Sequence, residues 1–217
     1  MTTRANASVV CGNCGQTSEQ AVIFSTNEMG SPDLDLRPPE GRRSTMDTWL
    51  QACPACGHVA EELDEAPADP AVLTTEAYEA ALASPGFPPL ARRFLAHAVA
   101  SGAAADPGGA GRSLLRAAWV CDDAGEASLA ADCRRRAAAA LGEVPEDADA
   151  GPRAAVRVDA LRRAGDADEA AAACEAALEL PAAAGFLRDV LLFQRRLIGR
   201  GDTAAYTLDA LEEDGDD

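Results

Sequence analysis

The sequence predicts a mainly α-helical protein in which a small N-terminal module with short β strands precedes an array of helical hairpins. Three observations support this fold class. Two Cys-x2-Cys pairs lie near the N-terminus. Alanine dominates the apolar residues and aromatic residues make up only 4% of the chain, which favours closely packed helices because alanine is the best helix former. Three glycines, Gly125, Gly165 and Gly201, recur at intervals of 40 and 36 residues between helical segments.

Length and charge limit the organisation and the partners. The 217 residues suit one small module and one larger domain, which we place at residues 1–65 and 66–217. The formal net charge is −17, with 36 acidic residues against 19 basic residues that are all arginine. Such a field repels phosphate backbones, so we do not expect general binding of nucleic acid. Either GC-rich coding or a high-salt proteome explains the acidic, lysine-free composition.

The location predicted from the sequence is cytoplasmic. We expect no membrane association, because no apolar run approaches the roughly 18 residues that a membrane span needs. Residues 1–10 also lack the apolar stretch of a secretory signal. Thiols stay reduced in such a compartment, so the paired cysteines are better interpreted as metal ligands than as disulfides.

The two cysteine pairs predict a structural zinc site formed by Cys11, Cys14, Cys53 and Cys56. Two residues between cysteines let both thiolates face one ion from a tight turn, and the glycine that follows each pair supplies the left-handed conformation of that turn. Four thiolates suit tetrahedral Zn²⁺ and leave no open position for catalysis. His58 is an alternative ligand, although we expect it to cover the site or cap a strand.

Strand-like sequence around the cysteine pairs predicts a zinc ribbon. Residues 21–24 follow the first pair and residues 48–51 precede the second, so each pair should lie at the end of a hairpin. So small a module depends on its metal for folding. The acidic, proline-containing segment 61–70 has the composition of a linker, from which we expect the ribbon and the helical domain to have separate cores.

A long insertion, residues 29–43, separates the two cysteine pairs. Its prolines and glycines exclude regular structure. One interpretation is a loop packed on the ribbon. The other is a recognition loop that uses Asp33, Asp35 and Arg37, since long loops on rigid scaffolds often carry function.

The remainder of the sequence has helical patterns. We expect helices at 75–84, 89–104, 111–124, 127–141, 152–164, 168–180, 186–200 and 203–213. Gly125, Gly165 and Gly201 each end a helix, and an acidic residue favours the start of the next one. A period of this length is typical of stacked helical hairpins. Trp119 should be buried between hairpins, because apolar residues flank it at helical spacing.

The stretch Gly165–Leu178 resembles a tetratricopeptide repeat. The protein as a whole resembles an uncharacterised bacterial family that joins a four-cysteine zinc ribbon to tetratricopeptide-like helices. The matching pieces are Cys11-x2-Cys14, residues 30–39, Trp49, residues 53–57 and residues 114–119. The resemblance implies architecture and zinc binding, and no reaction follows from it.

The function predicted from these features is that of a non-enzymatic zinc-binding scaffold or adaptor that binds a protein or peptide partner through its helical repeats. One alternative is a nucleic-acid-associated regulator that uses Arg37, Arg42 and Arg43 of the ribbon. A second alternative is a redox sensor based on the scattered cysteines. These cysteines are Cys121, Cys133 and Cys174, which are best explained as small core residues.

The first helices of the predicted hairpins are rich in arginine and the second helices are rich in acidic residues. Arg116, Arg157 and Arg195 are our candidates for the lining of a groove that binds an acidic peptide or the carboxyl terminus of a partner protein, since arginine forks suit carboxylates. The alternative is that these arginines pair with acidic residues of the neighbouring second helices.

Overall fold

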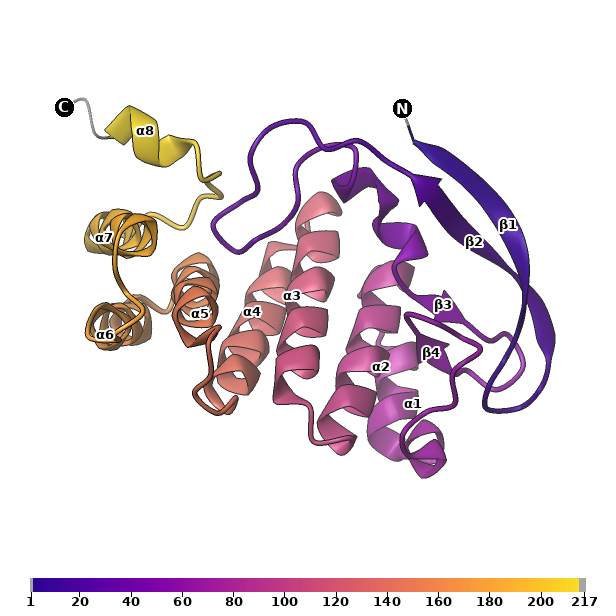
Figure 1. The fold of residues 1–217 in the computed structure, drawn as a ribbon. Coiled ribbons are helices and arrows are strands. Elements are labelled where there is room, and N and C mark those ends of the chain that lie inside the picture. Colours follow the sequence, from indigo (N-terminus) through magenta and orange to yellow (C-terminus); the bar gives the residue numbers. More distant parts are fainter. Residues whose placement is uncertain (1, 215–217) are drawn as a thin grey trace.

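The computed structural model describes residues 2–214, and Figure 1 shows a row of helices with the N-terminal strands along one side. The N-terminal elements are β1 (Thr3–Val10), β2 (Thr17–Ser25), the 3-10 helix η1 (Arg43–Thr48), β3 (Gln51–Ala52), β4 (Val59–Ala60) and the 3-10 helix η2 (Pro70–Thr74). The α helices are α1 (Glu76–Ala83), α2 (Pro89–Ala103), α3 (Pro107–Asp123), α4 (Ala127–Gly142), α5 (Ala150–Ala164), α6 (Ala167–Leu178), α7 (Phe186–Gly199) and α8 (Ala210–Asp214). The predicted fold class, mainly helical with a small N-terminal sheet before helical hairpins, is confirmed.

Each cysteine pair lies at the turn of an antiparallel hairpin, as predicted. β1 pairs with β2, with Val10 opposite Thr17, and β3 pairs with β4. The Gln20 side chain joins the two hairpins by donating to the Ala52 carbonyl at 3.0 Å and accepting from the Ala52 N–H at 3.3 Å. Of the predicted strand 48–51, only Gln51 is in a strand, because the residues before it belong to η1 and its turn.

The helices α1 to α7 begin and end within four residues of the predicted positions. The three repeat glycines have positive φ angles of 75°, 84° and 65°, as a left-handed helix end requires. The N–H of each of these glycines bonds to the carbonyl three residues before it, and the next N–H bonds to the carbonyl five residues before its own position. Within residues 2–214, none of the helices combines the length and hydropathy needed to cross a bilayer.

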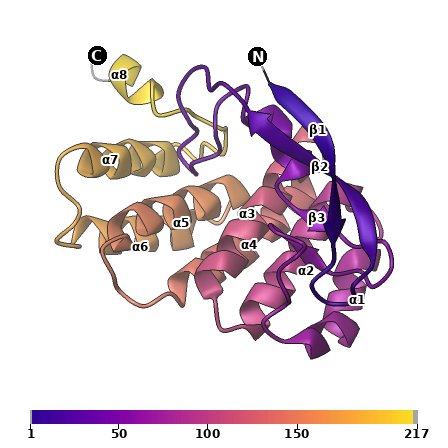
Figure 2. The ribbon, with the colours of Figure 1, turned by 45° about the vertical axis from the view of Figure 1, so that its right-hand side comes forward.

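The prediction of a helix at 203–213 is wrong for most of that segment. The backbone is irregular from 202 to 206, and only α8 is helical. The reason is pairing with the insertion: the Leu34 N–H donates to the Tyr206 carbonyl at 2.9 Å, and the Leu208 N–H donates to the Pro32 carbonyl at 2.9 Å. Figure 2 shows the insertion beside this C-terminal segment.

A buried arginine also holds the C-terminal segment in its non-helical form. Arg162 of α5 pairs with Asp159 at 2.6 Å, and both side chains are 1% exposed. The guanidinium also donates to the carbonyls of Asp202 at 2.7 Å and Ala204 at 2.9 Å. These long-range bonds replace the local bonds that a helix would have made.

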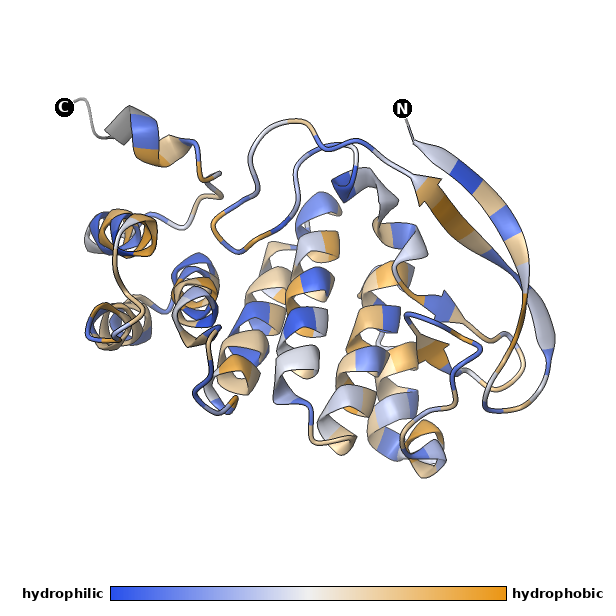
Figure 3. Ribbon diagram, in the orientation of Figure 1, coloured by the Kyte–Doolittle hydropathy of each residue, from blue (hydrophilic) through white to orange (hydrophobic). Residues whose placement is uncertain are grey.

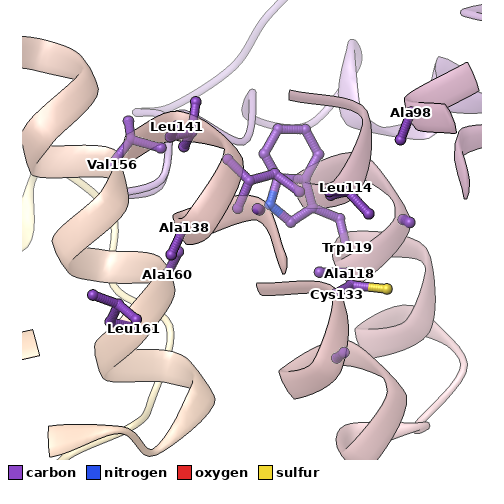
Figure 4. Close-up of a cluster of buried hydrophobic side chains, with 14 of the residues drawn as sticks. Ala98, Leu114, Ala118, Trp119, Cys133, Ala138, Leu141, Val156, Ala160 and Leu161 are labelled. Atoms are coloured by element: carbon purple, nitrogen blue, oxygen red, sulfur yellow. The ribbon is translucent and has the colours of Figure 1, made fainter. Parts of the chain in front are cut away.

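Part of the ribbon and the insertion share the hydrophobic core of the helices, so the expectation of separate cores is wrong for these parts, while Cys11, Cys53 and Leu63 form a second, small cluster. Leu34, Met46, Leu50 and Val59 belong to the same buried cluster as the apolar residues of the helices. Trp119 is in this cluster and is 6% exposed, which confirms the prediction that it is buried. Figure 4 shows its indole projecting from α3 on the side of Leu141 and Val156, and Figure 3 shows apolar residues at the bend of the insertion beside α3.

Candidate metal centre

The four cysteines of the two pairs meet in space. The sulfur atoms of Cys11, Cys14, Cys53 and Cys56 all lie within 4.8 Å of one another. Two of the distances cross between the pairs, 3.7 Å from Cys11 Sγ to Cys56 Sγ and 3.6 Å from Cys14 Sγ to Cys53 Sγ. This cluster could hold a metal ion.

The two cysteine turns have the same backbone geometry, which is why their sulfur atoms converge. The Gly15 N–H donates to the Cys11 carbonyl at 2.9 Å, and the Gly57 N–H donates to the Cys53 carbonyl at 3.0 Å. Both glycines have a φ of 74°. The prediction that these glycines supply left-handed turn conformations is confirmed, and the reason is that a side chain at this φ would be strained.

The predicted linker covers the first cysteine turn. Leu63 is completely buried and packs with Cys11 and Cys53, and its carbonyl accepts a 2.8 Å hydrogen bond from the Gly12 N–H. A Cβ atom at Gly12 would lie 2.4 Å from the carbonyl carbon of Glu65. The interpretation of residues 61–70 as a linker is therefore wrong at its start, because this one apolar residue packs against the two buried cysteines, while Cys14 remains exposed.

Two further residues complete the surroundings of the cluster. His58 is 3% exposed, with Nδ1 3.8 Å from Cys11 Sγ, and burial lowers its pKa. Tyr78 of α1 is completely buried, and its hydroxyl donates to the Gly57 carbonyl at 3.0 Å and accepts from the Val59 N–H at 3.1 Å. The sequence carried no signal for Tyr78, since only the tertiary structure brings α1 against the second turn.

The thiols of the cluster differ in acidity. Burial opposes ionisation of Cys56, but hydrogen bonds from the Asn13 side chain and the His58 backbone lower its pKa to about 7. For Cys14, a backbone hydrogen bond at Gln16 favours the thiolate, yet its contact with Cys56 and the other thiols raises its pKa to about 12. A metal ion bound here would release the protons that such thiols retain.

The three candidate recognition residues of the insertion are buried inside the protein. Asp35 is 2% exposed, and its Oδ2 accepts from Trp119 Nε1 at 2.8 Å and from Arg163 Nη1 at 3.0 Å. Arg37 donates to Asp123 at 2.6 Å. The insertion is thereby anchored to α3 and α5, whereas the packed alternative had placed it on the ribbon.

Asp33, the third of these residues, is 5% exposed and accepts from Arg43 at 2.7 Å. Burial raises its pKa, and the Arg43 guanidinium opposes that rise. Arg42 pairs with Glu28 at 3.1 Å. The basic residues of the ribbon are thus engaged within the protein.

The three candidate groove arginines do not meet at one site. Arg116 donates to Glu61 at 2.7 Å, and its guanidinium lies 5.4 Å from the centre of the Trp49 ring. Arg157 donates to the Ala138 carbonyl of α4 at 3.0 Å. Arg195 lies 3.6 Å from Glu175 of α6. Only Arg195 therefore pairs with an acidic residue of a neighbouring second helix, the alternative left open by the sequence, because Arg157 bonds to a backbone carbonyl of α4.

Arg116 instead lines a cleft of about 770 Å³, here called the helical cleft. Its walls are α3 as far as Trp119, the end of α4 at Leu141, the segment that connects α4 to α5 and the N-terminal half of α5. The insertion and Trp49 form a further wall. The lining residues are Asp35, Leu36, Pro38, Arg42, Trp49, Ala105, Asp106, Pro107, Gly108, Arg112, Leu115, Arg116, Trp119, Leu141, Val144, Pro145, Asp147, Asp149, Pro152, Arg153 and Val156.

The scattered cysteines and the second histidine lie among the helices. Cys121, Cys133 and Cys174 are completely buried. His97 Nδ1 lies 2.8 Å from the hydroxyl oxygen of Ser113, which is 1% exposed. Burial lowers the pKa of His97, and the residue lines a second cavity of about 400 Å³ together with Ser113 and Arg116.

Comparisons of this sequence and structure with protein-family models, curated proteins and solved structures find no match. Fold and site together define the class: a mainly helical protein whose N-terminal ribbon carries a four-cysteine cluster.

Proposed function

We propose that this protein is a non-enzymatic adaptor, stabilised by zinc, that binds a protein or peptide partner through its helical repeats. The observation that carries this proposal is the helical cleft, because its walls come from helices and from an insertion that is held in place by the buried ion pair Asp35–Arg163 and by the pair Arg37–Asp123. Rigid walls favour binding, because the protein loses little conformational entropy when the partner binds.

The geometry of the cysteine cluster supports zinc as the metal. Tetrahedral coordination with Zn–S bonds of about 2.3 Å separates the sulfur atoms by about 3.8 Å, and the two cross-pair distances are 3.7 and 3.6 Å. Four thiolates fill the coordination sphere. Zinc would therefore hold the two hairpins together.

Metal analysis tests the zinc assignment. We expect one zinc per protein molecule in material purified without added metal, and a cobalt-substituted form with the absorption of four thiolate ligands. Cys174→Ser is the matched control, because this cysteine is buried in α6 outside the cluster. Wild-type protein without zinc, or a cobalt spectrum that indicates fewer than four thiolate ligands, would contradict the assignment.

Two observations favour the adaptor over the alternatives. Arg37, Arg42 and Arg43 each pair with a carboxylate of the protein, which reduces the charge that the ribbon offers to phosphates. The three scattered cysteines are completely buried, whereas redox-sensing thiols are accessible.

Cross-linking combined with affinity capture tests the adaptor function. The tagged, zinc-loaded protein is cross-linked in cells of its source, and captured partners are mapped by mass spectrometry. We expect partner cross-links on α3 to α7 that persist after nuclease treatment. Capture that depends on nucleic acid, or cross-links confined to the β1–β2 hairpin, would overturn the proposal.

A further inference from the structure

We propose that the helical cleft binds an extended peptide segment in which a large apolar side chain lies next to a carboxylate. This inference rests on the proposed adaptor function and names the class of ligand. It is carried by the shape of the helical cleft, by a strained residue at its edge and by the arginines around it.

The helical cleft has the size and the apolar surface of a peptide site. Its volume of about 770 Å³ is within the range of about 300–1,000 Å³ that is common for ligand pockets. Leu115, Leu141, Val144 and Val156 contribute apolar side chains to its lining. An apolar side chain of a ligand would displace water from this surface.

Backbone strain is concentrated at the same place. Among the described residues, the two non-glycine residues with positive φ are Leu36 (63°) and Ala105 (57°), and both line the helical cleft. A residue with a Cβ atom is disfavoured in this conformation, and such strain is often found at binding sites. At Ala105 it has a local cause, because this residue is the left-handed end of α2, where the Ala105 N–H bonds to the Gly102 carbonyl and the Asp106 N–H bonds to the Ser101 carbonyl.

Leu36 is not at a helix end and is therefore the residue of interest. The pairs Asp35–Arg163 and Arg37–Asp123 hold the backbone on either side of Leu36.

Leu36 is also 54% exposed, although its two neighbours are buried. Glycine would adopt this φ without strain and would not expose an apolar side chain to water. Leucine is therefore unfavourable at this position in the free protein on two grounds. A ligand that covers Leu36 would remove the exposure of this apolar side chain to water. We therefore expect Leu36 to contact the apolar part of the peptide.

The lining of the helical cleft holds four aspartates, Asp35, Asp106, Asp147 and Asp149, as well as four arginines, so a carboxylate is favoured only at an individual arginine whose present partner is exposed. The four arginines are Arg42, Arg112, Arg116 and Arg153. Their carboxylate partners are largely exposed, with side-chain exposures of 47%, 55%, 60% and 53%. Exposed ion pairs contribute little to stability, so a carboxylate of the ligand can replace the present carboxylate partner of one of these arginines.

Arg116 is the best placed of these four arginines. Only 23% of its side chain is exposed, and the guanidinium is positioned over Trp49 at 5.4 Å. A planar guanidinium held beside apolar surface can bind a carboxylate with both N–H groups.

Selection from a random peptide library displayed on phage tests the proposal with the full-length, zinc-loaded protein. We expect enriched peptides to carry Leu, Phe or Trp within two residues of Asp or Glu. Affinities of the selected peptides are then measured by fluorescence anisotropy. No enrichment over a blank surface, or enrichment of peptides without acidic residues, would overturn the inference.

Variants locate the binding. Arg116→Gln should lower the affinity for the selected peptides about tenfold, the loss expected for one charge-assisted interaction. The matched control is Arg195→Gln, since Arg195 is an ion-paired helical arginine outside the helical cleft, and it should bind as the wild type does. Equal affinities of the two variants would contradict the proposed site.

Leu36→Gly separates binding from folding. We expect weaker peptide binding together with a thermal midpoint equal to or above that of the wild type, because the substitution relieves strain. Unchanged binding, or a lower midpoint, would show that Leu36 serves the fold alone. If partners cross-link to the helices and the Arg116→Gln substitution does not change this cross-linking, this inference fails while the adaptor function stands.

Discussion

Cys53→Ser should destabilise the whole protein, helices included. Loss of one of four thiolates removes most of the metal affinity, and structural zinc contributes roughly 10 kcal/mol or more of apparent binding energy in small zinc modules. Because ribbon residues such as Leu50 and Val59 are in the same core as the helices, this loss is transmitted beyond the ribbon. The expected result is a single thermal transition at a clearly lower temperature, followed by helical ellipticity at 222 nm.

The control for this prediction is Cys174→Ser, which alters a buried cysteine of α6 and leaves the cluster intact. It should retain its metal and show a smaller shift. A Cys53→Ser protein whose helices melt at the wild-type temperature would show that the helical part folds independently, contrary to the shared core. Removal of the metal from the wild type with a chelator should reproduce the effect of Cys53→Ser.

Asp35→Ala should lower the free energy of unfolding by about 3–5 kcal/mol, the range for breaking a buried ion pair from one side. The Asp35 carboxylate accepts from Arg163 and from the Trp119 indole. The Arg163 side chain is only 8% exposed, so its charge would lose one of two carboxylates in a place that water scarcely reaches. Urea unfolding followed by tryptophan fluorescence measures the change.

Asp47→Ala provides the comparison. Asp47 is another aspartate of the N-terminal part in an ion pair, with Arg4 at 2.9 Å, but 54% of its side chain is exposed. Exposed pairs are worth at most about 1 kcal/mol, so this variant should remain close to the wild type. If Asp35→Ala were equally mild, the insertion would not be anchored through Asp35 as described.

The anchors of the insertion also position one side of the helical cleft. A backbone hydrogen bond from Met29 to Glu40 joins the ends of the insertion, while Asp35 and Arg37 fix its centre to α3 and α5. Leu36 lies between these two anchors and lines the helical cleft. Loss of either anchor is therefore expected to weaken peptide binding as well as stability.

Local patterns in the sequence were sufficient for much of the architecture. The Cys-x2-Cys-Gly spacing predicted the four-cysteine cluster and the left-handed turns, because both turns depend on a few adjacent residues. Alanine-rich periodicity and the repeat glycines predicted α1 to α7, since helix formation and helix ends are governed by local backbone preferences. The burial of Trp119 followed from the apolar spacing around it.

Tertiary structure alone decided how the parts are joined. Asp33, Asp35 and Arg37 suit a solvent-facing loop equally well, and only their distant partners Arg43, Arg163 and Asp123 make them internal anchors. Leu63 lies in an acidic segment yet packs against Cys11 and Cys53 of the cysteine cluster. The C-terminal segment at 203–207 has helical composition, but hydrogen bonds with the insertion hold it irregular. Contacts between residues far apart in the sequence leave no periodic signal, so local patterns do not reveal them.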